Sequence, residues 1–206
     1  MGRLLRMTKI GPRYRVQFRR KREKKTNYYL RRKLLESREP RLIIRGSNKH
    51  MTVQVITAHP EGDRTVAAAN TIQLVRDFDW KAGTCNLPAA YLTGLLLGLR
   101  AQKKNIKQAV LDVGFQAVVY GSRIFASLKG IVDSGLHVAH NEIVFPSEER
   151  IRGEHIASYS ELLQESEEDM EKHEHQFSNY KKRGLSPGNI PKHFEQTKRK
   201  ILTMYK

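Results

Sequence analysis

The first 49 residues combine many cations with aromatic side chains, and these residue types suit nucleic-acid binding. The stretch holds 18 Lys and Arg against three acids, so it carries +15 of the chain's net charge of +17. Between the cations lie four aromatic residues, Tyr14, Phe18, Tyr28 and Tyr29. Lys and Arg neutralise phosphates, while aromatic rings lie against sugars or unpaired bases. The pattern therefore predicts a polyanionic partner.

Charge alone leaves two other interpretations of this arm open, a solvated disordered tail and a membrane-surface anchor. Against the tail, the segment from Thr26 to Ser37 has helical organisation, with leucines on one side and cations elsewhere. Against the anchor, Arg19 to Lys25 has no apolar face to insert. We expect an arm that presents cations outward and orders along RNA.

The remaining charge divides into three zones. Residues 50–141 have nine basic and six acidic residues, residues 142–174 have three basic and 11 acidic residues, and residues 175–206 have eight basic residues and one acid. The net charges are +3, −8 and +7. The acidic zone is not expected to face RNA; we expect it to meet a basic neighbouring protein or the chain's own cationic segments.

Length and composition favour one core domain with extensions. The single cysteine, Cys85, excludes an intramolecular disulfide and a Cys-cluster zinc site, so we expect a cytosolic protein. No apolar run suits a secretory signal, and Leu87 to Leu99 is interrupted and shorter than the roughly 20 residues that span a membrane. We expect no membrane contact.

The neutral zone has the patterns of an α/β core. Strands are predicted at 42–44, 51–56 and 64–70, and the turns at 47–49 and 60–63 make them an antiparallel meander. A helix follows, with Asn86 as cap and Pro88 in its first turn, then a buried strand at 109–113 and a helix from about Arg123 to Ser134, ended by Gly135. The order β-β-β-α-β-α predicts a mixed sheet with flanking helices.

Gly94 and Gly98 form a GxxxG pair in the first of these helices. In a short amphipathic segment this pair predicts close packing on a strand or a neighbouring helix instead of a membrane dimer.

The C-terminal zone predicts further helices. Ser147 is placed to cap a helix that Gly153 ends. The acidic stretch from Ser158 to Glu174 has few apolar anchors, so we expect it to need an external surface. A last helix begins at Pro191 and carries Lys198, Arg199 and Lys200 as a second candidate RNA contact.

Five segments of the sequence, in their order along the chain, resemble the archaeal form of the family of large-subunit ribosomal protein eighteen, the 5S-rRNA-binding protein. They are GPRYRVQFRRKREKKTNYYLRRKLL at 11–35, RGSNKH at 45–50, NLPAAYLTGLL at 86–96, GSRIFASLKGIVDSGL at 121–136 and FPSEERIRGEHIA at 145–157. The resemblance is specific to about Ala157. Beyond it the likeness to the family's C-terminal extension is looser.

The resemblance implies which residues contact rRNA. In the arm they are Arg13, Tyr14, Arg15, Phe18, Arg19, Arg20, Lys21, Arg22, Lys24, Lys25, Tyr28, Arg31, Arg32 and Lys33. The turn Ser47, Asn48, Lys49 and His50 matches another contacting motif, in which polar side chains donate to phosphate or ribose while Lys49 neutralises charge. The alternative is that Ser47 and Asn48 only make the turn.

Gly121, Ser122 and Arg123 match the loop that opens the second core helix. Backbone N–H groups at a helix N-terminus can receive a phosphate there. This chain has the shorter archaeal loop instead of the longer bacterial one, so simple helix capping by Ser122 stays open as an alternative.

The resemblance further implies a ribonuclease H-like fold, with the chain divided into an arm and helix (1–39), an α/β core (40–141) and a largely helical extension (142–206). It implies a structural constituent of the large ribosomal subunit that anchors 5S rRNA to the large-subunit rRNA in the central protuberance. Its partners would be these RNAs and neighbouring ribosomal proteins, without homo-oligomerisation. A general RNA chaperone is the alternative.

A metal-dependent nuclease is a further alternative, because ribonuclease H-like sheets support such enzymes and Asp112 lies on a strand. That chemistry needs several carboxylates converging on two Mg²⁺ ions. The other acids lack a shared locus: Asp63, Asp77, Asp79 and Asp133. We expect Asp112 to be satisfied by a backbone or basic partner.

Other catalytic and metal-binding patterns are missing from the sequence. The eight histidines contain no HExxH, Cys85 has no identifiable base partner, and no GxxxxGK[ST] loop occurs. We expect no enzyme, no metal and no cofactor.

Overall fold

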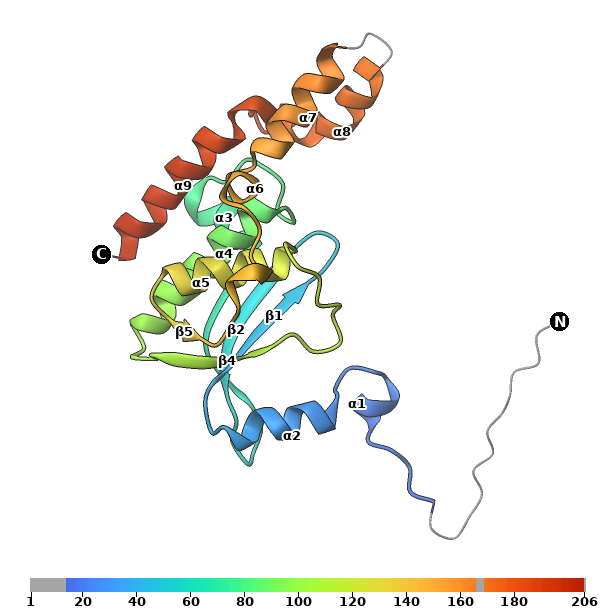
Figure 1. Ribbon diagram of the computed structural model, residues 1–206, viewed down its shortest axis with the longest axis vertical. Coiled ribbons are helices and arrows are strands. Elements are labelled where there is room, and N and C mark those ends of the chain that lie inside the picture. Colours follow the sequence, from blue (N-terminus) through green and yellow to red (C-terminus); the bar gives the residue numbers. More distant parts are fainter. Residues whose placement is uncertain (1–13, 166–168, 206) are drawn as a thin grey trace, which may run out of the picture.

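The computed structural model describes residues 14–165 and 169–205 of the chain (Figure 1). Among these residues five strands form one mixed sheet in the order β3-β2-β1-β4-β5. The strands are β1 (Arg41–Gly46), β2 (Met51–Thr57), β3 (Arg64–Asn70), β4 (Gln108–Asp112) and β5 (His137–Val138). β1 to β3 pair antiparallel, while β4 is parallel to both β1 and β5. The predicted α/β class, the mixed sheet and the antiparallel meander are confirmed.

One face of this sheet forms the apolar core. The register places Leu42 opposite Val55 and Ile44 opposite Val53, and all four side chains are fully buried. Because side chains alternate between faces along a strand, the intervening positions of β1 point to the second face. That second face is mixed and includes Arg41, Ile43 and Arg45.

Three helices, α3 (Thr71–Phe78), α4 (Leu87–Gln102) and α5 (Arg123–Asp133), follow the strands or lie between them. The core side of the sheet is covered by α4 and α5 (Figure 1). The predicted start of α4 is confirmed, because the Ala89 backbone N–H donates to Asn86 Oδ1 over 3.0 Å and Pro88 lies in the first turn. The left-handed Gly135, at φ 99°, follows the C-cap of α5 as predicted.

Glycines let α4 and α5 approach closely. An added Cβ would lie 2.0 Å from the Ser127 carbonyl oxygen at Gly94 and 2.2 Å from the Tyr91 carbonyl oxygen at Gly130. Only glycine fits at these two positions, where α4 and α5 cross. The GxxxG pair therefore packs on a neighbouring helix, which was one of the two expected roles.

The N-terminal helices α1 (Arg19–Arg22) and α2 (Tyr28–Glu36) lie beside the second face. Asn27 caps α2, since its Oδ1 accepts from the Leu30 N–H over 3.2 Å. A cavity of about 310 Å³ between α2 and the sheet is lined by Leu30 and Leu34 as well as by Ile43 and Ile56. No residue of α2 is fully buried, so α2 is held less tightly than the core helices.

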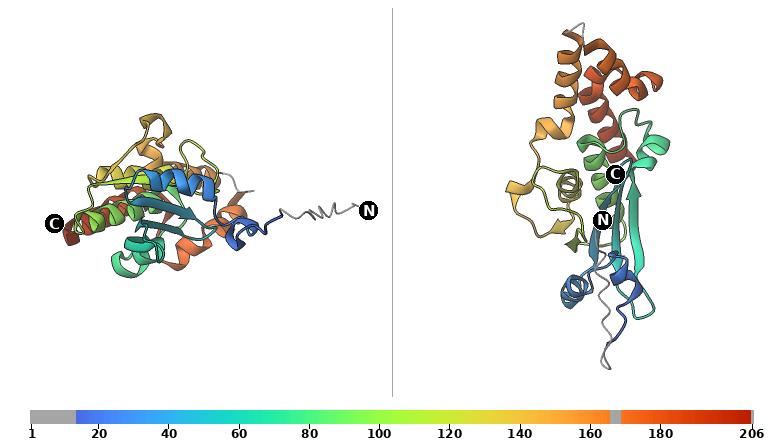
Figure 2. Two further views of the ribbon diagram at one scale, coloured as in Figure 1. Left: turned by 90° about the horizontal axis from the view of Figure 1, so that it is seen from below. Right: turned by 90° about the vertical axis from the view of Figure 1, so that its right-hand side faces the viewer.

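The C-terminal region contains α6 (Glu148–Arg152), α7 (Glu154–Glu165), α8 (Met170–Lys182) and α9 (Ile190–Tyr205), with short 3-10 turns η1 (Glu142–Val144) and η3 (Pro187–Asn189). Gly153 ends α6 in the left-handed conformation, at φ 88°. The last helix, α9, returns to the core, where Phe194 and Ile201 are buried. Figure 2 shows that α7 and α8 stand at the end of the molecule opposite to α1 and α2.

The acidic stretch packs partly inside the chain. Leu163 of α7 and Phe177 of α8 are buried, and His173 is buried with its Nε2 2.9 Å from Ser160 Oγ. Leu162 and Met170, by contrast, are 59% and 57% exposed. Contact of this stretch with an external surface therefore stays a prediction.

Several details differ from the sequence prediction. The order β-β-β-α-β-α omits α3 and the two-residue β5. Asn70 ends β3 and also caps α3, with its side chain and that of Gln73 forming a capping box, so no loop separates the two elements. The strand predicted as buried at 109–113 is β4 at 108–112, and it is only partly buried, since Val110 and Leu111 are half-buried. Ser147 is the N-cap of α6, but its side chain makes no capping hydrogen bond.

None of the helices in residues 14–165 and 169–205 is both long and apolar enough to cross a membrane.

Candidate nucleic-acid interface

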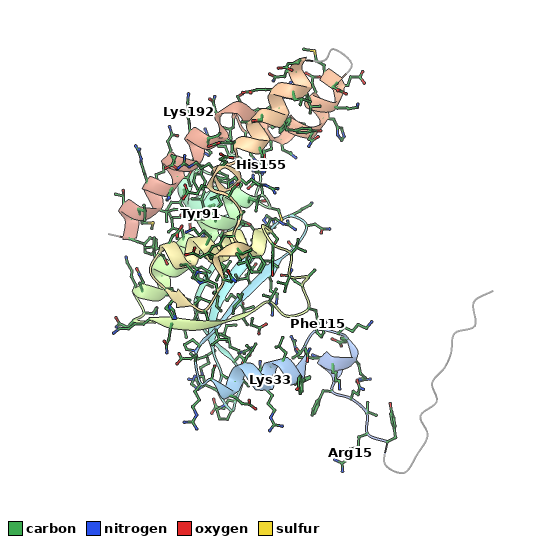
Figure 3. All side chains as sticks on the ribbon, viewed as in Figure 1. Arg15, Lys33, Tyr91, Phe115, His155 and Lys192 are labelled. Carbon is green, nitrogen blue, oxygen red and sulfur yellow. The ribbon has the colours of Figure 1, made fainter. Side chains whose placement is uncertain are left out.

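The arm presents its cations and rings to solvent. Phe18 is 71% exposed, and its ring centroid lies 5.2 Å from that of Tyr28. In Figure 3 Arg15 and Lys33 point away from the core. Arg13 lies outside the described residues. The predicted arm residues with exposed side chains are Tyr14, Arg15, Phe18, Arg19, Arg20, Lys21, Arg22, Lys24, Lys25, Arg32 and Lys33.

A few local contacts link neighbouring residues of this arm. Arg20 Nε donates to Thr26 Oγ1 over 2.8 Å, and Lys25 forms an ion pair with Glu23, with 2.9 Å between Nζ and Oε2. Lys24 takes the left-handed conformation, at φ 53°, between α1 and α2. Exposed pairs of this kind contribute little stability, so the cations stay accessible to phosphates.

Arg31 differs from the other arm cations, because it fastens α2 to the core. Its Nη1 and Nη2 donate to the two carboxylate oxygens of Asp63 over 2.6 and 2.7 Å. These hydrogen bonds, together with those from Arg41, lower the pKa of Asp63 to about 2. At neutral pH Asp63 is therefore an anion committed to the protein, and Arg31 is half-buried instead of free for RNA.

Beneath this contact lies a charged network that the sequence did not predict. Arg41 is 2% exposed, and it donates to Asp63 over 2.5 Å and to Asp112 over 3.1 Å. Arg45 Nη2 donates to Asp112 Oδ1 over 3.0 Å. The prediction that Asp112 is satisfied by a basic partner is confirmed. Carboxylates neutralised by guanidinium groups do not offer a site for two Mg²⁺ ions.

The predicted turn at Ser47 to His50 is built by Ser47 itself. Its backbone N–H donates to the His50 carbonyl over 2.8 Å, and its Oγ accepts from the His50 N–H over 3.0 Å. Asn48 and Lys49 are exposed at the tip. Ser47 thus makes the turn, while rRNA contact at Ser47 and at the exposed tip stays a prediction.

The structure brings this turn close to the Gly121–Arg123 loop, through the segment around Cys85. Thr84 Oγ1 donates to the Lys49 carbonyl over 2.6 Å, and the Cys85 thiol donates to the Ser47 carbonyl over 3.0 Å. On the other side Arg123 Nη1 donates to the Cys85 carbonyl over 3.0 Å and also contacts its Sγ. Ser122 is the N-cap of α5, yet its side chain makes no capping hydrogen bond. The Ser122 side chain therefore does not cap the first turn of α5, and a phosphate contact there stays a prediction.

The cations of α9 lie on a different part of the molecule from the arm (Figure 1). Arg199 and Lys200 are exposed, whereas Lys198 is half-buried with its Nζ 5.3 Å from the centre of the Tyr91 ring. Lys198 thus helps to hold α9 on α4.

Within the described residues, no group of three or more His, Cys, Asp or Glu side chains could hold a metal ion. Burial lowers the pKa of His155 and of His193, which favours their neutral forms. His193 Nε2 accepts from the Lys81 N–H over 3.0 Å.

Comparison with known proteins relates this chain to proteins of the large ribosomal subunit. A family model described as "Ribosomal large subunit proteins 60S L5, and 50S L18" matches residues 12–108 and 100–141. The large ribosomal subunit protein uL18 of Caldivirga maquilingensis is 53% identical over 193 residues, which cover 94% of this chain and 92% of that protein. The uL18 proteins of Aeropyrum pernix and Staphylothermus marinus are each 50% identical over 196 residues, covering 95% of this chain and 91% and 96% of those proteins.

Proposed function

We propose that this chain, which belongs to the family of ribosomal large-subunit proteins 60S L5 and 50S L18, binds 5S rRNA and anchors it to the large-subunit rRNA in the central protuberance. It is an archaeal uL18 protein, a structural constituent of the large ribosomal subunit and not an enzyme. It works in the cytoplasmic ribosome, with rRNA and other ribosomal proteins as partners.

The observation that supports 5S rRNA binding best is the exposed arm of cations and rings mounted on a rigid core. Arg31 and Asp63 fix α2 to the sheet, while the other arm cations from Arg15 to Arg38 are exposed. Such an arm can bind a polyanion without any change in the core, because phosphate contacts require only accessible cations.

The proposed footprint includes three further sets of residues beside the arm. They are the turn Ser47, Asn48, Lys49 and His50, the helix start Ser122 and Arg123, and the α9 cations Lys198, Arg199 and Lys200.

We propose that the chain acts as a single copy. Its proposed parts are an arm at 1–39, a ribonuclease H-like core at 40–141 and an extension at 142–206.

Salt dependence of 5S rRNA binding tests the arm. The triple variant R15Q/R22Q/K24Q removes three exposed cations, each of which accounts for about 0.7 to 0.9 in the slope of log K against log salt if it meets a phosphate. We expect the slope to fall by about 2. The charge-matched control K103Q/K104Q/K107Q alters exposed lysines outside the footprint and should leave the slope nearly unchanged. Equal slopes in the triple variant and the native protein would refute the arm contacts.

A general RNA chaperone is distinguished by its selectivity. An anchor should enrich 5S rRNA over other RNAs after a high-salt wash of the tagged protein, because many fixed contacts must match one folded RNA. A random RNA profile in this pull-down would support the chaperone and contradict the anchor.

A further inference from the structure

The loop that joins β4 to α5 exposes four large apolar side chains within six residues. Phe115 is 59% exposed, Val118 62%, Val119 58% and Tyr120 67%. Single exposed apolar residues need no explanation, but a contiguous group of them marks an interaction site. None of the contacts described above uses these side chains.

Hydrogen bonds hold this loop in one shape. The Gln116 side chain accepts from the Gly46 N–H over 3.2 Å and donates to the Gly46 carbonyl over 2.8 Å. At the other end the Gly121 N–H donates to the Val144 carbonyl over 2.9 Å. The Tyr120 ring stands edge-on to the buried Phe125 ring, with 6.5 Å between the ring centres. The exposed rings are thus presented by an ordered loop.

Behind the loop is a hollow of about 310 Å³, lined by Met51, Val119, Ser122 and Arg123 among others. The Ser122 hydroxyl oxygen in its wall is buried and has no hydrogen-bond partner among the described residues. A volume near 300 Å³ is at the small end of ligand pockets. The hollow therefore combines apolar walls with an unused polar group and a cation.

The charge around the loop favours a nucleic acid as its occupant. No acid occurs from residue 113 to residue 132, and Asp112 is already paired with Arg41 and Arg45. Gly114, next to Phe115, lines the same cavity as Arg20 and Lys25 of the arm. In the view of Figure 3 Phe115 lies between the core and α1. The apolar loop thus borders the cations that are proposed to hold phosphates.

We infer that Phe115 and Tyr120 form a stacking platform for unpaired bases of the rRNA whose phosphates the arm neutralises. This inference rests on the proposed function. Every base has an apolar face that stacks on an aromatic ring, while its backbone requires cations nearby. Both requirements are met at this loop.

The double variant F115A/Y120A tests the platform by titration with 5S rRNA at several salt concentrations. We expect affinity to fall about tenfold for each lost ring, while the salt slope keeps its native value because no phosphate contact is removed. F115Y/Y120F keeps both rings and should retain native affinity. The control Y159A removes an exposed ring from acidic α7 and should also bind normally. The thermal unfolding midpoint of each variant shows that the fold is kept.

A fluorescence measurement tells base stacking on the ring at position 120 apart from a general loss of shape complementarity between the loop and the RNA. The native chain has one tryptophan, Trp80, which is 1% exposed, so Y120W adds an exposed reporter. An RNA with unpaired loop bases should quench this reporter, and a fully paired duplex should not.

The outcomes separate the two proposals. If the native protein does not prefer 5S rRNA, the proposed function fails. If it does, but F115A/Y120A binds as tightly as the native protein, the platform is overturned and the proposed function stands. Reporter quenching by the duplex alone would overturn the platform as well.

Discussion

Asp63 connects the arm to the core at the level of single side chains. Its carboxylate accepts from Arg31 of α2 and from Arg41 of β1, and Arg41 also reaches Asp112 of β4. Burying a guanidinium group costs several kcal/mol of desolvation, which close carboxylates offset only when the geometry is good. Arg41 Nε has no hydrogen-bond partner among the described residues, so the carboxylates of Asp63 and Asp112 must offset the desolvation of Arg41.

Asp63→Asn should therefore destabilise the protein in a pH-dependent way. The neutral amide cannot balance Arg41, so we expect a loss of about 1 to 3 kcal/mol at pH 7, less than for a fully buried pair because Asp63 is partly exposed. The pKa of Asp63 is lowered to about 2 in the folded protein, against about 3.9 in an unfolded chain. A lowered pKa stabilises the fold above the unfolded value and loses this effect as pH falls towards 2.

Urea denaturation between pH 7 and pH 2.5 measures this effect. The stability gap between the native protein and Asp63→Asn should be constant above about pH 5 and narrow below pH 4. Asp79→Asn, at a carboxylate that is 68% exposed and 3.8 Å from Lys81, should change stability by less than about 0.5 kcal/mol. A gap that is the same at every pH would contradict this role of Asp63.

At the scale of elements, the α4–α5 crossing depends on the absence of side chains. Gly94→Ala would place a methyl group 2.0 Å from a backbone oxygen that cannot move without shifting α5. Overpacking costs about 1 to 3 kcal/mol, occasionally more, and this exceeds the gain of about 1 kcal/mol in helix propensity. We expect a lower urea midpoint for Gly94→Ala. At Gly188, where nothing lies within 4 Å of an added Cβ, the same substitution should be nearly neutral; equal effects at both positions would disprove the packing argument.

The elements that the sequence predicted well are those with a local signal. Asn86 and Pro88 mark the start of α4, and strand alternation marks β2, because capping and periodicity are set by neighbouring residues. α3 was missed because its cap, Asn70, is also the last residue of a strand. The packing of α7 on α8 was not predicted, because Leu163 and Phe177 lie on two separate helices and only the turn between the helices brings them together.

In the candidate site, too, the sequence predicted the features that lie in one contiguous segment and not those that join distant segments. The arm's cations are a run in the sequence, whereas the Arg41–Asp63–Asp112 network joins three segments that only the folded sheet brings together. The loop at 115–120 has no local signal of this kind, because an apolar run such as AVVY suits a core as well as a surface, and only the folded structure shows that it is exposed.

At the scale of the whole molecule, charge is separated along the long axis. The basic arm lies at one end, and α7 and α8 lie at the other (Figure 2). α7 carries three acids, among them the exposed Glu161, and no Lys or Arg, whereas α8 carries two acids and three lysines. The surface of α7 repels phosphates, so we expect the RNA to approach from the arm's end.

We expect the fold to require α9 at the C-terminal side but not the basic arm at the N-terminal side. Deleting residues 190–206 removes Ile190, Phe194 and Ile201, all buried in the core. Each such side chain contributes about 1.5 to 3 kcal/mol, so the loss is about 5 kcal/mol or more. At about 2 to 4 °C per kcal/mol, the midpoint of thermal unfolding should fall by more than about 10 °C. His193, stacked on Trp80 with 5.0 Å between ring centres, leaves with α9, so Trp80 fluorescence should shift to the red. Deleting residues 1–25 should change the midpoint little, because the residues it removes from 14 onward are all exposed. A C-terminal deletion that melts like the native chain would show that α9 is an appendage, although its side chains complete the core.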